Sequence, residues 1–167
     1  MKTITISESK NDNPQDVTER IKTFEDALKE LGGDHSFVKE YQRLTINGAP
    51  SADVEAYLKL RIICAALNEG WKPQFTEDER RWFPWLLLYT QIDIDKMNEQ
   101  EKTHRHIIPT SDDQTEYAGL AYSSSGLAAG GSFASIGFRL CLKTEELAEY
   151  CGKQFIHLWA DFYIIRK

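Results

Sequence analysis

The first half of the chain carries apolar residues at helical spacing, separated by short polar breaks. The first such stripe contains Ile21, Phe24, Leu28 and Leu31. It predicts a helix that begins at Asp16, where Asp16 and Glu19 can satisfy free amide groups, and ends at the Gly32–Gly33 pair. Two further stripes predict a short helix over 36–44 and a longer one from the N-cap Ser51 to just before Gly70. The longer helix is the main core candidate of this half.

The middle of the chain has shorter and less regular patterns. Thr76 and Glu79 have the spacing of a capping box and predict a helical turn, which Pro84 must end because proline cannot continue a helix. The apolar run from Trp85 to Tyr89 predicts a buried strand. The polar stretch 93–102 predicts a helical turn or a loop.

The last third has the pattern of strands followed by a helix. Residues 117–123 and 136–143 predict two strands, and residues 106–108 predict a weaker one. Thr144 is predicted to begin a long helix that reaches Ile165, with acidic residues at its positive end. Helices, then strands, then a helix indicate an α+β fold, in which N-terminal helices pack with a small antiparallel sheet of three to four strands and a long C-terminal helix.

Length and composition are typical of a single domain. The chain has 167 residues, of which 41% are hydrophobic, and can bury a core without a disulfide or a metal. We expect residues 1–15 to form a flexible tail or an added edge strand, and residues 16–167 to form a single globular domain.

Charge and hydropathy limit the classes of partner expected for this chain. The net charge of −6 and the scattered basic residues argue against a nucleic-acid partner. The first ten residues do not resemble a signal peptide, and no apolar run is long enough to span a bilayer. We therefore expect no membrane partner and a cytoplasmic location.

Candidate catalytic chemistry is sparse. Cys64, Cys141 and Cys151 form an odd set without CxxC spacing, and their apolar surroundings predict buried, reduced thiols. The chain has no phosphate-binding glycine signature, and no nucleophile elbow surrounds Ser124 or Ser125. The sequence therefore predicts no cofactor and favours a protein without catalytic activity.

Two histidines, His104 and His106, are the candidate metal ligands of this sequence. His104 and His106 would share a face if their segment were a strand, and Asp112 or Asp113 lies nearby in the sequence. No HExxH motif or second ligand cluster supports them. We favour solvent-facing histidines and predict no metal site, with a metal-dependent hydrolase kept as the weakest hypothesis.

An aromatic cluster marks the connector after the third predicted helix. Its members are Trp71, Phe75, Trp82, Phe83, Trp85 and Tyr89. One interpretation, which we favour, is a connector that folds onto the core. The other is a stacking platform for a sugar, a base or a peptide, with Trp71, Trp82 and Trp85 as the binding residues.

A segment of small residues separates the two stronger predicted strands. Residues 123–135 include Ser124, Ser125 and three glycines, and they predict a loop that a ligand or a partner backbone can approach closely. Arg139 follows within an apolar strand, where it indicates a paired or interfacial charge rather than a lone buried one. We include Ser124, Ser125 and Arg139 among the candidate binding residues.

Two stretches of the chain resemble a known family. Residues 57–85 read YLKLRIICAALNEGWKPQFTEDERRWFPW, and residues 137–155 read GFRLCLKTEELAEYCGKQF. Together they resemble an uncharacterised family found in gut Bacteroidetes genomes, their prophages and related phages, in which the second motif is of the GSRLCFK-ELAEYAGKQF type. Here Phe138 stands where serine is common and Cys151 where alanine is common. The resemblance covers most of residues 16–165 and implies a mobile-element origin, but it implies no activity and no site residue.

These observations lead to three hypotheses about function. The first is a non-catalytic interaction or assembly module, associated with phage, that binds a protein partner or itself in the cytoplasm or on a virion. The alternative is a small-ligand, carbohydrate-like binding protein that uses Trp71, Trp82 and Trp85. The third is the metal-dependent hydrolase.

Overall fold

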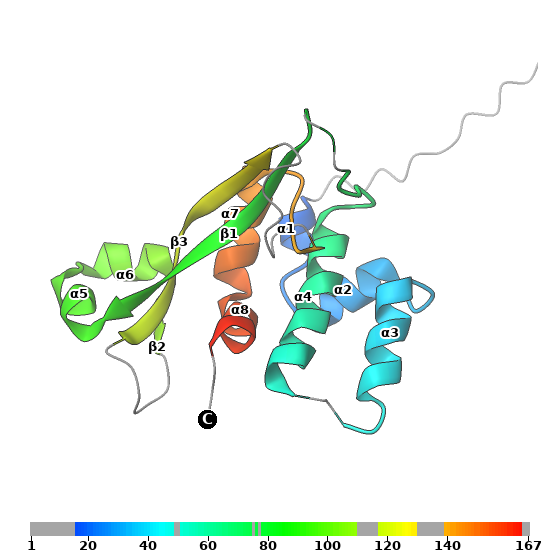
Figure 1. The fold of residues 1–167 in the computed structure, drawn as a ribbon, viewed down its shortest axis with the longest axis horizontal. Helices are drawn as coiled ribbons and strands as arrows, with labels where there is room; N and C mark the ends of the chain where they lie inside the picture. Colours follow the sequence, from blue (N-terminus) through cyan, green and yellow to red (C-terminus); the bar gives the residue numbers. More distant parts are fainter. Residues whose placement is uncertain are drawn as a thin grey trace, which may run out of the picture.

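The computed structural model describes residues 16–48, 51–74, 76, 78–109, 117–129 and 139–164. The segment 1–15, predicted as a tail or an edge strand, lies outside these residues. Within them the chain is α+β, as the sequence predicted: helices α1 to α4, a three-stranded antiparallel sheet with α5 and α6, and then α7 and α8. Figure 1 shows β1 and β3 as a long ribbon, with α5 and α6 at one end and the N-terminal helices at the other.

The N-terminal helices are α1 (Val17–Arg20), α2 (Phe24–Leu31), α3 (Ser36–Thr45) and α4 (Ala52–Leu67). The predictions for α3 and α4 are confirmed, and Ser51 is the N-cap residue of α4. The single helix predicted from Asp16 is wrong, because the chain leaves helical geometry at Ile21 and starts again after Thr23. Thr23 and Asp26 form a complete capping box, which stabilises a new helix start there.

The sheet has the order β1–β3–β2, with β1 (Arg80–Thr90), β2 (Ile108–Pro109) and β3 (Tyr117–Ala129). The helical turn predicted at Thr76–Glu79 is wrong, because the described residues of this range, Thr76, Asp78 and Glu79, are not helical and β1 begins at Arg80. Pro84 lies within β1, where an edge strand tolerates the missing N–H. The weak strand predicted at 106–108 is confirmed only at Ile108.

The strand predicted at 117–123 is confirmed, but it continues to Ala129. The loop predicted over 123–135 is therefore wrong for its first part, because residues 124–129 pair with β1. Residues 130–135 lie outside the described chain. The strand predicted at 136–143 is wrong for residues 139–143, where the one bridge to another described residue joins Leu142 and Trp82; residues 136–138 lie outside the described chain.

The polar stretch after β1 forms α5 (Gln91–Lys96) and α6 (Glu99–Arg105), in agreement with the predicted helical turn. The long C-terminal helix is instead two helices, α7 (Glu145–Gln154) and α8 (Ile156–Tyr163). Thr144 caps α7 as predicted, but Phe155 departs from helical geometry at φ −110° and ψ 27°. The indole N–H of Trp159 donates to the Cys151 carbonyl at 3.3 Å, so a side chain bridges the break.

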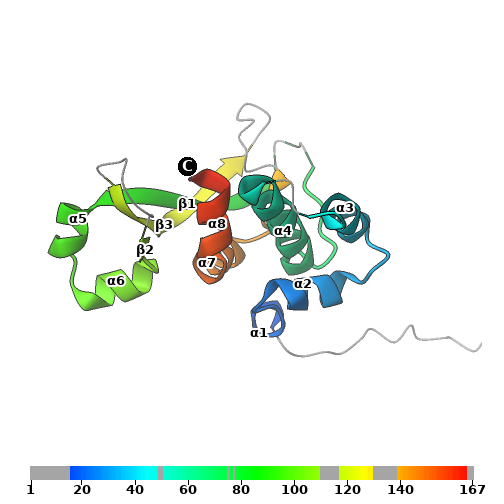
Figure 2. The same ribbon diagram turned by 90° about the horizontal axis from the view of Figure 1, so that it is seen from below.

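The core lies where α4 meets α7, α8 and the inner face of the ribbon. Figure 2 shows α7 and α8 between the ribbon and the N-terminal helices. The largest fully buried apolar side chains are Trp159, Ile21, Leu60, Ile62, Ile63, Leu67, Leu140 and Leu142. They come from both ends of the chain, so the core is non-local.

Asn68 fixes the segment before α7 against the end of α4. Its Nδ2 donates to the Cys141 carbonyl at 3.0 Å, and its Oδ1 accepts from the Lys143 amide at 3.0 Å. The side chain is buried, so these two bonds replace the water that both groups would otherwise bind. Asn68 thereby holds Leu142 in position to pair with Trp82.

Gly152 allows α7 to lie close to the ribbon. A Cβ at this position would be 2.6 Å from Pro84 Cβ and 2.8 Å from Tyr122 Cδ2.

We expect Gly152→Val to lower the free energy of unfolding by about 1–3 kcal/mol, because the new side chain forces the helix away from the ribbon. Urea unfolding measures this change. Gln42→Val, at an exposed position of α3, is the control and should unfold almost like the wild type. An unchanged midpoint for Gly152→Val would contradict the close packing.

Candidate functional site

The outer face of the β1–β3 ribbon, the face turned away from α7, presents aromatic and apolar side chains. We define it by Phe83, Trp85, Leu87, Ser124 and Gly126. Successive residues of a strand point to opposite faces, which places Phe83, Trp85 and Leu87 together. Register confirms the β3 members, since Gly126 is opposite Phe83 and Ser124 opposite Trp85. Trp85 is 54% exposed and Leu87 is 46% exposed, which is unusual for large apolar residues of a strand.

Gly126 supports the two aromatic rings of the outer face. The rings of Phe83 and Trp85 stack with centroids 6.4 Å apart and planes inclined by 29°. A Cβ at Gly126 would overlap the indole of Trp85 and come within 2.9 Å of the Phe83 ring. The absence of a side chain at residue 126 therefore lets both rings lie down on the ribbon. The result is a flat apolar ledge with one indole face turned outward.

The inner face of the ribbon belongs to the core. Trp82 packs against the hydrophobic core, and Pro84 lies against α7 at Gly152. The hydroxyls of Ser125 and Tyr122 are 2.9 Å apart, and Ser125 donates to the Glu145 carbonyl at 3.4 Å. These contacts attach β3 to the start of α7.

The candidate binding residues from the sequence are thus divided between the two faces. Trp82 and Trp85 are three residues apart on a strand and point to opposite sides, and half-buried Trp71 lies before the strand begins. Ser124 and Ser125 are likewise separated, the first on the outer face and the second on the inner. The structure therefore does not bring the three tryptophans to one face. Trp85 and Ser124 are the predicted residues that it does bring together.

Arg139 does not lie in an apolar strand. It is exposed, in a short turn three residues before Leu142. The expectation of a charge set within a strand is wrong, because the segment 139–143 meets β1 through the single bridge at Leu142.

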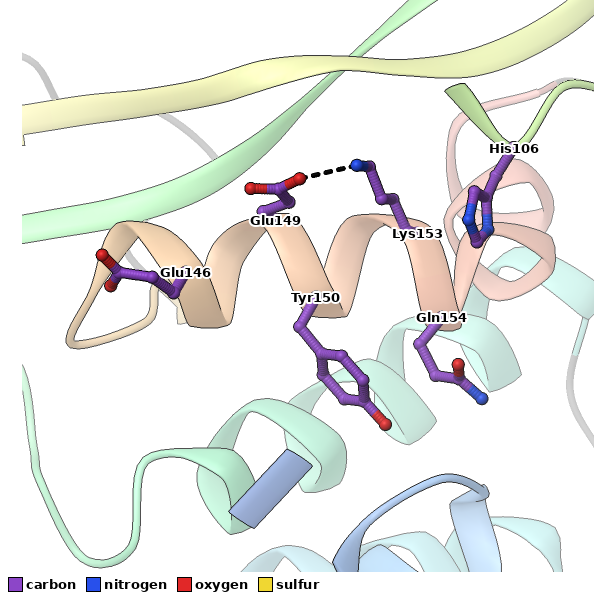
Figure 3. Close-up of a pocket in the computed structure, with 6 residues that line it drawn as sticks. All are labelled: His106, Glu146, Glu149, Tyr150, Lys153 and Gln154. Carbon is purple, nitrogen blue, oxygen red and sulfur yellow. Dashed lines mark hydrogen bonds and ion pairs between the residues drawn. The ribbon is translucent and has the colours of Figure 1, made fainter. Parts of the chain in front are cut away.

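A shallow pocket of about 390 Å³ lies along α7 (Figure 3). It is lined by His106, Glu146, Glu149, Tyr150, Lys153 and Gln154. Tyr150 donates its hydroxyl to the Ile21 carbonyl at 2.8 Å, and Gln154 donates to the Lys22 carbonyl at 2.8 Å. Burial raises the pKa of Tyr150 to about 12. These two groups attach α7 to the segment between α1 and α2.

The charged lining of the pocket is also engaged within the chain. Lys153 forms an ion pair with Glu149 at 2.6 Å, and its ammonium lies 5.1 Å from the centre of the Tyr122 ring. This pocket was not predicted from the sequence. The signal for it was the recurrence of polar residues every three or four positions from Glu146 to Gln154, one face of α7.

The two histidines do not share a strand. His104 lies in α6, with Nε2 3.5 Å from Lys153 Nζ, and His106 ends α6 in a left-handed conformation at φ 50°. Asp112 and Asp113 lie outside the described residues. Within the described part of the chain, no three His, Cys, Asp or Glu side chains gather where they could hold a metal ion.

The three cysteines are buried, as the sequence predicted. Cys64 donates to the Leu140 carbonyl at 3.4 Å. A hydrogen bond with Cys151, together with burial, raises the pKa of the Cys64 thiol well above its ordinary value. Burial raises the pKa of Cys141 to about 11. Burial and a raised pKa make Cys64 and Cys141 poor nucleophiles, and the buried Cys151 packs in the hydrophobic core.

Comparison with protein-family models, with curated proteins and with solved structures finds no match. Across the residues that the structure describes, no helix has the length and apolar character needed to cross a membrane.

Proposed function

We propose that this chain is a non-catalytic interaction module, of the kind encoded by phages and prophages, and that the outer face of the ribbon is its contact surface. The observation that carries the proposal is the ledge of Phe83 and Trp85, continued by Leu87. Large apolar side chains gathered on one exposed surface are typical of protein contact sites, and tryptophan is enriched among the residues that contribute most to binding.

The rest of the site supports a binding role over a catalytic one. The polar groups that line the shallow pocket along α7 are engaged in contacts within the chain, as Tyr150 and Gln154 show. A sugar site built from three tryptophans would need rings on one side of the chain, whereas Trp82 packs into the core. A flat apolar ledge suits the side chains of a protein partner better than a small polar ligand.

Site-specific photo-cross-linking tests the proposal. The photoreactive residue p-benzoylphenylalanine replaces Trp85 in the full chain, which is irradiated in cells that naturally produce the protein. We expect adducts of discrete mass, identified by mass spectrometry as one or a few proteins, including further copies of this chain. The same residue at Ile46, which is 79% exposed on the turn after α3, is the control and should give only background. Equal adducts at both positions, or none at position 85, would sink the proposal.

A further inference from the structure

The turn that follows α3 is an exposed segment in which glycine comes directly after asparagine. The helix ends at Thr45, and its C-cap residue Ile46 is 79% exposed. Asn47 and Gly48 are exposed as well, and the side chain of Asn47 forms no hydrogen bond with another described residue. An added Cβ at Gly48 would meet no atom within 4 Å. The side-chain amide of Asn47 is therefore free to rotate beside an uncrowded backbone.

The other asparagines of the described chain are held in place. Asn68 is buried, and both polar atoms of its side chain bond to the segment 141–143. Asn98 is the N-cap residue of α6, and its Oδ1 accepts from the Glu101 amide at 2.9 Å. A glutamate follows each of these two asparagines, and its side chain crowds the next backbone nitrogen, whereas glycine leaves that nitrogen open. Asn47 thus differs from both in its mobility and in its neighbour.

One hydrogen bond engages the backbone nitrogen next to Asn47. The amide of Gly48 donates to the Thr45 carbonyl at 3.0 Å. This bond lies beyond the last helical residue of α3, and helix ends fray at almost no cost in free energy. The bond can therefore open while the core stays folded, which releases the nitrogen of Gly48.

We propose that Asn47 is a site of spontaneous deamidation, which converts it into isoaspartate and aspartate. Asparagine is among the chemically labile residues of proteins. The backbone nitrogen of Gly48 gives up its proton to a base in the solvent and attacks Cγ of Asn47. A C–N bond forms, the Cγ–Nδ2 bond breaks, and the amide group takes up a proton and leaves as ammonia. Water then opens the five-membered imide at its backbone carbonyl, which gives isoaspartate, or at its side-chain carbonyl, which gives aspartate.

The reaction consumes one water, releases one ammonia and changes the end of α3. Either product places a carboxylate beside the C-terminal end of the helix, where the dipole is already negative. Isoaspartate also lengthens the backbone between Ile46 and Gly48 by one carbon. Both changes weaken the last turn of α3, so this turn exists in two charge states whose ratio follows the age of the molecule. The inference is independent of the proposed function.

Ageing of the purified full chain in mildly alkaline buffer, followed by peptide mapping with mass spectrometry, tests the proposal. We expect product at residue 47 to form at least ~10-fold faster than at Asn68, which reacts only after the core around it opens. Asn98 should also react more slowly. The rate at residue 47 should rise with pH, because the attacking nitrogen must lose its proton. Isoaspartyl methyltransferase, which methylates the isoaspartate carboxylate, should label the aged chain but not the fresh one.

Asn47→Gln is the matched variant, because its longer side chain would have to close a larger ring. It should keep the melting temperature of the wild type and lose almost all methyl labelling. Equal deamidation of the three asparagines would overturn the proposal. It would also be overturned if residue 47 reacts in urea but stays unmodified in the folded chain, since the bond from Gly48 to Thr45 would then close the site.

Discussion

Replacing Trp159 with alanine is expected to lower the free energy of unfolding by about 3–5 kcal/mol. Trp159 is 1% exposed and is the largest buried side chain of α8. Its ring lies edge-on to Phe162 at 6.4 Å and stacks on Tyr163 at 5.8 Å. Its removal also takes away the indole donor that bridges the break between α7 and α8. The loss therefore combines a large cavity with an altered junction between two helices.

Denaturant unfolding followed by circular dichroism measures this effect without relying on tryptophan fluorescence. Trp85→Ala is the matched control, since it deletes the same side chain from a 54% exposed position. We expect the control to lose about 1 kcal/mol or less, because most of that indole is already in water. Similar losses for the two variants would mean that Trp159 does not pack as described.

Replacing Asn68 with leucine is expected to cost about 2–4 kcal/mol. Leucine has a similar volume but leaves the Cys141 carbonyl and the Lys143 amide without the partners that Asn68 provides. An unsatisfied buried polar group costs about 1–3 kcal/mol, and this substitution removes two hydrogen bonds to the same segment. The segment 141–143 should also loosen, and with it the Trp82–Leu142 bridge.

Hydrogen exchange gives this prediction a second, local measurement. The amides of Trp82 and Leu142 bond to each other's carbonyls and should exchange faster in Asn68→Leu than in the wild type. Asn47→Leu, in the exposed turn after α3, is the control and should change neither stability nor exchange at these amides. If Asn68→Leu is destabilised while these two amides keep their protection, Asn68 acts on the core but not on the bridge.

Elements that depend on neighbouring residues were predictable from the sequence. The helices α3 and α4 follow from apolar spacing, and Thr144 marks the start of α7 because its hydroxyl accepts a local amide. The α+β fold class follows from the order of these elements. These signals depend on residues that are close together in the sequence, so distant parts of the chain do not change them.

Elements that depend on distant partners were not predictable. The small residues after Ser123 have weak strand preferences, and β1 provides the partner that makes them part of β3. From the sequence, Pro84 predicted the end of a helical turn. A strand tolerates a proline at the edge of a sheet, and the position of β1 in the sheet depends on residues far away in the sequence. The break at Phe155 is stabilised by the Trp159 indole one turn later, which helical periodicity does not reveal.

Residues of the candidate site could be predicted from the sequence, but their arrangement in space could not. The aromatic cluster before and within β1 was identified, and Trp85 with Phe83 forms the outer ledge. Trp82 can be assigned to the core and Trp85 to the surface only when residues 80–90 are known to form one strand. In a strand successive side chains alternate between the two faces, so residues three positions apart lie on opposite faces. The support from Gly126 comes from a strand more than thirty positions later, which local reasoning cannot supply.

The assembly of the core from both ends of the chain has a consequence for biosynthesis. The hydrogen bond from Tyr150 to Ile21 joins residues 129 positions apart, and α8 packs on α4. As the chain leaves the ribosome, α2 and α3 can pack on α4, but the side of α4 that meets α7 and α8 stays uncovered until those helices are made. At about 5–20 residues per second, that interval is on the order of ten seconds. The native core therefore closes only after α8 has been made.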